Sequence, residues 1–255
     1  AASSGAGTTL TLGGVVSDGG NSRGMSYLGG TVILTAANTY TGASQTQGGA
    51  LQLGNGGLTG SVASTSFVND GLLTFKRTDA VGTPFVFSPT VSGSGPVDVL
   101  SGAVRMDNDN TVSGTVTIAS GATLQLGNGG TTGSIGSTDI VDDGSLIYDR
   151  SGSVSLKVAI SGNGSVTYRG LATYNLSSDN SYSGGTSISG SATVVVSGST
   201  ALGSGLATVD SGGALALDGT AVSLALTNPL ALAGSGPSGF GALQNRGGLN
   251  SASGV

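Results

Sequence analysis

A twelve-residue segment occurs twice in this chain with little change. LQLGNGGLTGSV covers residues 51–62, LQLGNGGTTGSI covers residues 124–135, and ten of the twelve positions are identical. Two copies this similar, 73 positions apart, indicate one structural unit that the chain uses again. The fold must therefore repeat over a length of about 73 residues.

Each copy begins with two leucines that are spaced by two positions. They are Leu51 and Leu53 in the first copy and Leu124 and Leu126 in the second. Side chains that are two positions apart point to the same face of a β-strand. Both copies are therefore expected to start with a short strand that turns its leucines inward.

Gly-Asn-Gly-Gly follows the leucines in both copies. Glycine and asparagine reach positive φ at little steric cost, which is typical of a sharp turn. Asn55 and Asn128 either occupy left-handed turn positions or form an asparagine ladder inside the corner, and we favour the turn. The repeated segment is thus interpreted as a strand, a corner and a further strand.

Other segments recur with nearly the same step. Tyr40 lies in Asn-Thr-Tyr-Thr-Gly, and the related segments place Val112 and Tyr182 at offsets of 72 and 70, while Arg77 matches Arg150 at 73. A repeat of about 70–73 residues divides into three coils of about 24, whereas propeller blades usually run to about 40–50 residues. We therefore expect a parallel β-solenoid of roughly ten or eleven coils rather than a propeller or a sandwich.

The composition favours strands over helices. The chain contains 49 Gly, only 8% charged residues, and 13 acidic residues that are all Asp. Strong helix formers such as Glu and Lys are scarce, while Thr, Ser and Val are frequent, which is typical of strands and turns. We expect an all-β chain with no substantial helix, apart from a possible short turn in residues 221–232.

The two ends lack the features of terminal caps. Solenoids usually end in atypical coils with a polar outer face. Here the chain enters an alternating strand at residues 8–12, and residues 239–255 read as the opening of another repeat. We expect residues 1–255 to form one continuous solenoid segment of a longer chain, or a segment whose ends meet other chains.

Several classes of function are excluded by residues that the chain lacks. It contains no His and no Cys, so Ser-His-Asp and Cys-His catalysis and the usual zinc sites cannot be built. Its net charge is −5 without a basic cluster, which argues against nucleic acid as a partner. It has no apolar run long enough to span a membrane as a helix, so we expect no membrane insertion of this segment.

Aspartates are the remaining candidates for chemistry. Asp107 and Asp109 alternate along the chain and could share one face of a strand, as a glycosidase carboxylate pair or as part of a calcium site. Asp142 with Asp143, near Asp139, forms a second cluster. These aspartates lie among Asn, Gly and Ser, so we favour turn residues that bond to their own backbone. We expect no catalytic residues, no bound metal and no cofactor.

Aromatic residues recur in register with the repeat. A sugar-binding platform is one interpretation, but side chains that fill the coil interiors are the favoured one. The aromatic residues concerned are Tyr40, Phe75, Phe85, Phe87, Tyr148 and Tyr182.

The repeats resemble a known family. Residues 33–57, ILTAANTYTGASQTQGGALQLGNGG, are similar to the autotransporter-associated β-strand repeat in passenger domains of type V secreted proteins of Gram-negative bacteria. Residues 177–196 are similar to a second copy, and GALQNRGGLNS, residues 241–251, is similar to a stretch that often precedes another strand pair. The middle copy departs from the pattern, because Val112 replaces the tyrosine.

The resemblance implies a right-handed parallel β-helix that is exported through the outer membrane to the bacterial cell surface. It also implies a non-catalytic role as a stalk or adhesin, with other copies of itself or surface glycans and proteins as partners. A C-terminal translocator barrel, absent from this segment, would be a further partner. A carbohydrate-active β-helix enzyme, either a glycosidase or a polysaccharide lyase that uses Arg105 near Asp107, is the alternative.

Overall fold

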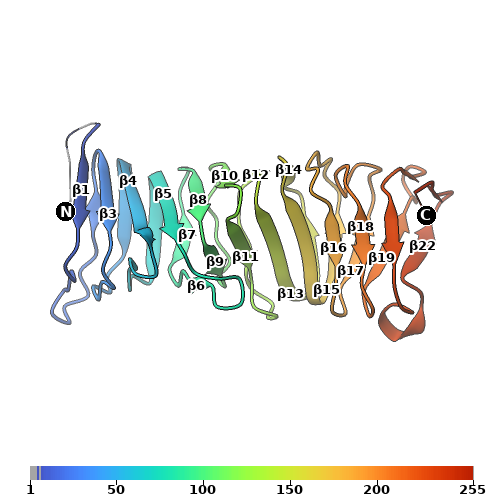
Figure 1. The fold of residues 1–255 in the computed structure, drawn as a ribbon, viewed down its shortest axis with the longest axis horizontal. Coiled ribbons are helices and arrows are strands. Elements are labelled where there is room, and N and C mark those ends of the chain that lie inside the picture. The colour runs from blue at the N-terminus through green and yellow to red at the C-terminus, as the bar shows by residue number, and fades with distance from the viewer. Residues whose placement is uncertain (1–4, 6, 255) are drawn as a thin grey trace. The chain divides into compact units, whose positions relative to one another are not determined.

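The computed structural model describes residue 5 and residues 7–254, and these residues form two compact units. The first unit contains residues up to Gln125 together with Gly133–Thr138, and the second contains Leu126–Thr132 and the residues from Asp139 on. In both units neighbouring strands pair in parallel (Figure 1). Each unit is therefore a parallel β-solenoid, and the chain has about eleven coils, which confirms the expected fold class.

The strands of the first unit are β1 (Thr9–Leu12), β2 (Ser26–Tyr27), β3 (Thr31–Leu34), β4 (Ser44–Gly57), β5 (Ser66–Arg77), β6 (Phe85–Val86), β7 (Thr90–Ser92), β8 (Val97–Ser101), β9 (Ala103–Met106) and β10 (Val116–Ile118). The strand β11 (Thr123–Leu126) ends at the first residue of the second unit. In the first unit, β1, β3, β4, β5, β8 and β10 pair in that order.

The strands of the second unit are β12 (Asp139–Asp142), β13 (Ser145–Leu156), β14 (Ala159–Ser161), β15 (Ser165–Leu176), β16 (Thr186–Ile188), β17 (Thr193–Val196), β18 (Ala207–Val209), β19 (Ala214–Asp218), β20 (Ala225–Leu226), β21 (Leu230–Leu232), β22 (Leu243–Gly247) and β23 (Ser251–Ala252). A single 3₁₀ turn, η1 (Pro237–Gly239), is the helical element of the described residues. The possible turn in residues 221–232 is wrong, because β20 and β21 occupy that segment.

The coils are shorter than expected in several places. Thr31 pairs with Ala50, 19 positions on, whereas Ser66 pairs with Thr90, 24 positions on. Most coils are thus somewhat shorter than the expected 24 residues, although Leu215 pairs with Leu243, 28 positions on. Parallel pairing in register over such short coils places chemically similar residues next to each other.

The repeated leucines form part of two buried ladders in the first unit. Leu51 pairs with Val32 and Leu73, and Leu53 pairs with Leu34 and Phe75. All these side chains are fully buried. Because burying one such side chain stabilises a fold by about 1.5–3 kcal/mol, the ladders account for the strict leucine spacing.

The second unit has a core rich in tyrosine. Tyr148 pairs with Tyr168 on the next coil, and their rings are stacked with centroids 5.5 Å apart and planes 4° apart. Tyr168 pairs in turn with Ile188, and the ring of Tyr174 lies 5.2 Å from that of Tyr168. The second unit therefore contains four of the six tyrosines of the chain, when the buried Tyr182 is included.

One corner of the first unit is built from a glycine column, which consists of Gly49, Gly71, Gly95 and Gly114. A Cβ atom on Gly71 would lie 2.0 Å from the Gly49 carbonyl oxygen, and one on Gly95 would lie 2.1 Å from that of Gly71. A Cβ on Gly114 would lie 2.3 Å from the Gly95 oxygen. Successive coils approach so closely at this corner that only glycine fits.

We expect Gly95→Ala to destabilise the first unit by about 1–3 kcal/mol, because the new methyl group must displace backbone. Gly82→Ala is the matched control, since nothing lies within 4 Å of its added Cβ, and we expect a change of less than about 1 kcal/mol. Urea unfolding followed by far-ultraviolet circular dichroism measures both. Equal midpoints for the two variants would contradict the close approach.

Candidate functional site

The recurring Asn-Thr-Tyr segments place one asparagine at a corner in each copy. These corner asparagines are Asn38, Asn110 and Asn180, and all are buried. They lie 72 and 70 positions apart, which is the step of the sequence repeat. The recurrence of these asparagines is visible in the sequence, but the sequence alone does not show what their side chains bind.

Asn110 connects three coils through its side chain. Its Oδ1 accepts a hydrogen bond from the Val91 amide at 2.8 Å, and its Nδ2 donates to the Ser134 carbonyl at 3.0 Å. Nδ2 also donates to the Asn108 carbonyl at 2.9 Å. A buried backbone group without a partner is costly, so Asn110 satisfies backbone groups of the coils on both sides.

The other two corner asparagines make equivalent bonds. Asn38 accepts from the Val16 amide at 2.8 Å and donates to the Ser61 carbonyl at 2.9 Å. Asn180 accepts from the Ile160 amide at 2.8 Å and donates to the Ala201 carbonyl at 2.7 Å. The same three-coil connection thus occurs in both units.

Asn55 and Asn128 have a different environment from the one that we favoured. Both are exposed, and their φ angles are not positive, whereas Gly54, Gly56 and Gly127 have φ of 82°, 84° and 87°. The interpretation of the asparagines as left-handed turn residues is therefore wrong. In the first copy the register of β4 against β5 shifts between Leu53 and Gly57, so the intervening residues bulge outward. The glycines, not the asparagine, supply the unusual backbone angles.

Arg77 holds the loop that follows this bulge. Its guanidinium donates to the carbonyl oxygens of Leu58 and Gly60, and its Nε donates to Asp79 at 2.7 Å. The guanidinium carbon lies 3.9 Å from the centroid of the Phe85 ring. Only 3% of the Arg77 side chain is exposed. An arginine can satisfy several acceptors at once because its five donors form a rigid fork.

Arg150 occupies the same place in the second copy. Its Nη2 donates to the carbonyl of Thr131, and Thr131 matches Leu58 at the repeat offset of 73. The arginine that follows each repeated segment therefore binds the loop within that segment. The match between the two arginines is visible in the sequence, whereas this shared role is not.

The predicted Asp107 and Asp109 are engaged separately. Asp107 accepts from Arg105 Nε at 2.9 Å. Asp109 accepts from the Gly133 amide at 3.1 Å and the Ser134 hydroxyl at 2.8 Å. Within residues 5 and 7–254, no group of three or more Asp, Glu, His or Cys side chains lies close enough to hold a metal ion.

Other aspartates also bond to the backbone of a neighbouring coil. Asp18 accepts from the Thr41 amide and hydroxyl, and the bonds from the Thr41 and Gly20 amides lower its pKa to about 2. Asp70 accepts from the Ser94 amide at 3.0 Å, and Asp143 accepts from the Asn163 amide at 2.9 Å. The structure thus places these carboxylates between coils, which is a structural role.

Asp142 differs from all of these, because its side chain is completely buried. Its Oδ1 accepts from the Gly144 amide at 3.0 Å. Its Oδ2 has no hydrogen-bond partner in the described part of the chain. Burial raises the pKa of Asp142 to about 6, because desolvation disfavours the charged form.

The predicted aromatic residues fill the interiors. Tyr40 and Tyr182 are buried, and the Tyr40 hydroxyl lies 2.7 Å from the Tyr27 hydroxyl. The Tyr182 hydroxyl lies 2.7 Å from Thr186 Oγ1. Phe75, Phe87 and Tyr148 are buried as well, while Phe85 is half-buried. The favoured interior location is thus confirmed for these residues, apart from the partial exposure of Phe85.

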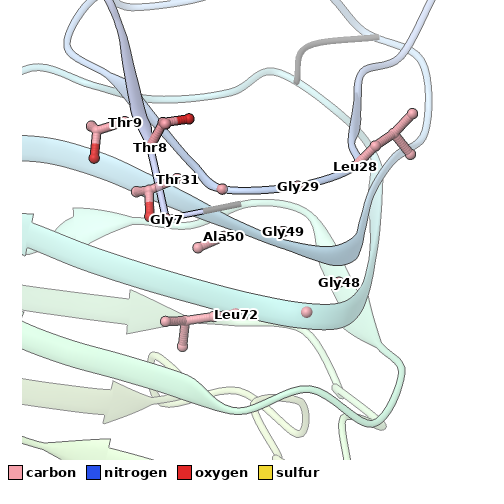
Figure 2. A pocket seen from close by; sticks show the side chains of 12 residues that line it. Gly7, Thr8, Thr9, Leu28, Gly29, Thr31, Gly48, Gly49, Ala50 and Leu72 are labelled. Atoms are coloured by element: carbon pink, nitrogen blue, oxygen red, sulfur yellow. The ribbon is translucent and has the colours of Figure 1, made fainter. Parts of the chain in front are cut away.

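An uncharged groove lies on the first unit beside the glycine column. Its volume is about 570 Å³. Figure 2 shows Thr8, Thr9 and Thr31 grouped at one end of the groove and Leu28 at the other. Gly49 and Gly71 of the glycine column also line the groove. The groove offers hydroxyl, backbone and apolar groups, but no charged side chain.

The chain is similar to one curated protein, "Adhesin BmaC autotransporter" of Brucella suis biovar 1 (strain 1330). The two are 32% identical over 155 residues, which is 54% of this chain and 4% of the relative. The chain therefore spans a small part of the length of that protein. No family model and no solved structure matches the chain. Among the described residues no helix is long and apolar enough to cross a membrane.

Proposed function

We propose that this chain is part of the passenger of an autotransporter adhesin, exported across the outer membrane and displayed on the bacterial cell surface. The similarity to the Brucella suis adhesin carries this proposal. Parallel coils and the repeats typical of such passengers support it. In this proposal residues 1–255 are a solenoid segment of a longer chain that has its own translocator barrel.

The proposed role is non-catalytic. A glycosidase needs two carboxylates that face one substrate, about 5–10 Å apart. In this chain Asp107 binds Arg105, and Asp109 binds the backbone of the adjacent coil. Asp142 is buried away from solvent. These engagements favour a structural and interaction role over the alternative of a carbohydrate-active enzyme.

The finer proposal is that the chain contacts surfaces or other copies of itself. Its charged fraction is only 8%, its net charge is −5, and several large apolar side chains are exposed, among them Leu58, Leu171 and Val222. Weak net repulsion and exposed apolar groups both favour association between surfaces. We propose surface glycans and proteins, or a second copy, as partners.

We expect beads coated with the chain to adhere to animal cells or to cluster with each other, because many weak contacts add up on a bead. Counting bound and clustered beads by microscopy measures both effects. Beads coated with an unrelated non-adhesive protein of similar charge are the control. Coated beads that neither adhere nor cluster beyond this control would count against the finer proposal.

A separate measurement tests the passenger assignment. The intact polypeptide in the outer-membrane fraction of the native source should be much larger than 24.2 kDa. Protease added to whole cells should degrade it, since a displayed passenger is accessible from outside. A polypeptide that is confined to the cytosol would overturn the proposal.

A further inference from the structure

Asp142 occupies the position that Asn69 has one repeat earlier. The two residues lie 73 positions apart in the matching segments NDG and DDG. The Gly95 amide donates to the Asn69 carbonyl at 2.7 Å, and the Gly164 amide donates to the Asp142 carbonyl, also at 2.7 Å. The backbone around the two side chains is therefore equivalent, and their chemistry can be compared directly.

Asn69 uses its side-chain amide as a donor. Its Nδ2 donates to the carbonyl oxygens of Gly95 at 2.9 Å and Pro96 at 2.8 Å. Its Oδ1 accepts from the Thr46 hydroxyl at 2.8 Å. A side chain at this position thus has to donate and to accept hydrogen bonds.

Asp142 can meet this requirement only when it carries a proton. Its carboxyl carbon lies 2.5 Å from where a Cβ on Gly164 would be, so the carboxyl group packs directly against the Gly164 backbone. An ionised carboxylate only accepts hydrogen bonds, whereas a protonated one also donates. The unpartnered Oδ2 is therefore the atom that would carry the proton.

In the part of the chain that the structure describes, no positively charged group is found to interact with Asp142. The charged or titratable groups that interact with it are Asp143, Tyr148 and Tyr182. The Tyr148 hydroxyl is itself buried without a hydrogen-bond partner in the described residues. A buried carboxylate without a counter-charge is strongly disfavoured.

We propose that Asp142 is a proton-binding site that makes the second unit sensitive to pH. Its neutral form has a donor at Oδ2, as the Asn69 side chain has one at Nδ2. When the proton leaves to solvent, this donor is lost and a negative charge remains buried in the core.

The direction of the pH effect follows from the two protonation states. The ordinary pKa of an aspartate is 3.8, and burial raises that of Asp142 to about 6. Between these values the unfolded chain has released the proton and the folded chain still holds it, so stability falls as pH rises from about 4 to about 6. The chain has no histidine, and histidine is the side chain whose ordinary pKa of about 6.5 lies near this range. A pH effect near pH 6 therefore cannot come from a histidine.

We expect the unfolding constant of the second unit to rise about twentyfold between pH 4.5 and 6.5. In Asp142→Asn this rise should be absent, because an amide donates at every pH. At pH 7 the unfolding constant of the variant should be about a hundredfold smaller than that of the native chain. Urea unfolding followed by tyrosine fluorescence reports mainly the second unit, which holds four of the six tyrosines.

Two further variants and one direct measurement complete the test. Asn69→Asp should introduce the same pH dependence into the first unit, measured by hydrogen exchange of its amides. Asp143→Asn removes a charge from the neighbouring exposed residue and should leave the pH dependence of the second unit in place. The carbon chemical shift of the Asp142 carboxyl should titrate near pH 6. A carboxyl that titrates below pH 4.5, or an equal pH dependence in the native chain and Asp142→Asn, would overturn the proposal.

Discussion

Asn110→Ala is expected to destabilise the first unit by about 1–3 kcal/mol. The substitution leaves the buried Val91 amide without its acceptor, which costs about 1–3 kcal/mol. The Ser134 carbonyl loses the bond from Nδ2 but keeps the one from the Asn110 backbone amide at 3.0 Å. Urea unfolding followed by circular dichroism gives the change in free energy. Hydrogen exchange gives a local measurement, because the Val91 amide should lose its protection first.

Asn55→Ala is the matched control for this prediction. Asn55 also lies in a repeated segment, but it is exposed, so its removal should change stability by no more than about 0.5 kcal/mol. If Asn110→Ala and Asn55→Ala changed the free energy of unfolding equally little, the hydrogen bonds of Asn110 to the neighbouring coils would not contribute to stability.

Arg77→Ala should cost about 3–5 kcal/mol, because it leaves two carbonyl oxygens and Asp79 without their buried donor. Arg77→Lys should recover little of this, since an ammonium group cannot reproduce the fork of donors. Urea midpoints measure both variants. Limited proteolysis should cut faster near Leu58, because the exposed loop is no longer held by the arginine.

Arg105→Ala provides the comparison. Arg105 and Asp107 are two positions apart, as Arg77 and Asp79 are, but their side chains are 20% and 36% exposed. Exposed pairs contribute about 0–1 kcal/mol, so this variant should be close to the native chain. Similar losses from Arg77→Ala and Arg105→Ala would mean that burial of the pair is not what matters.

The sequence repeat predicted the fold because residues that recur at a fixed step lie above one another in successive coils. Leu51 and Leu53 could be placed on an inward face from their spacing alone, and the step of 73 implied stacking coils. The coil length was less accurate, since turns and bulges add or remove residues without changing the pairing. The shift of β4 against β5 at Gly54–Gly56 is such a case, and no spacing rule would have located it.

The roles of polar residues were harder to predict. Asn38, Asn110 and Asn180 recur visibly, but their bonds join backbone groups about 20 positions away on either side, so they depend on the register of whole coils. Asn55 and Asn128 were prominent in the sequence and yet are exposed. Asp142 occupies the position of Asn69 one repeat later. An aspartate where the other copy has an asparagine was the sequence feature that could have indicated a buried carboxyl group.

The chain can vary its outer loops without altering its interior. The segment from Arg77 to Val91 is four residues longer than its counterpart from Arg150 to Ile160, yet Val91 and Ile160 donate equally to a corner asparagine at 2.8 Å. Insertions between fixed corners are therefore tolerated. A lineage that carries this architecture could diversify what it presents to its surroundings while inheriting the same scaffold.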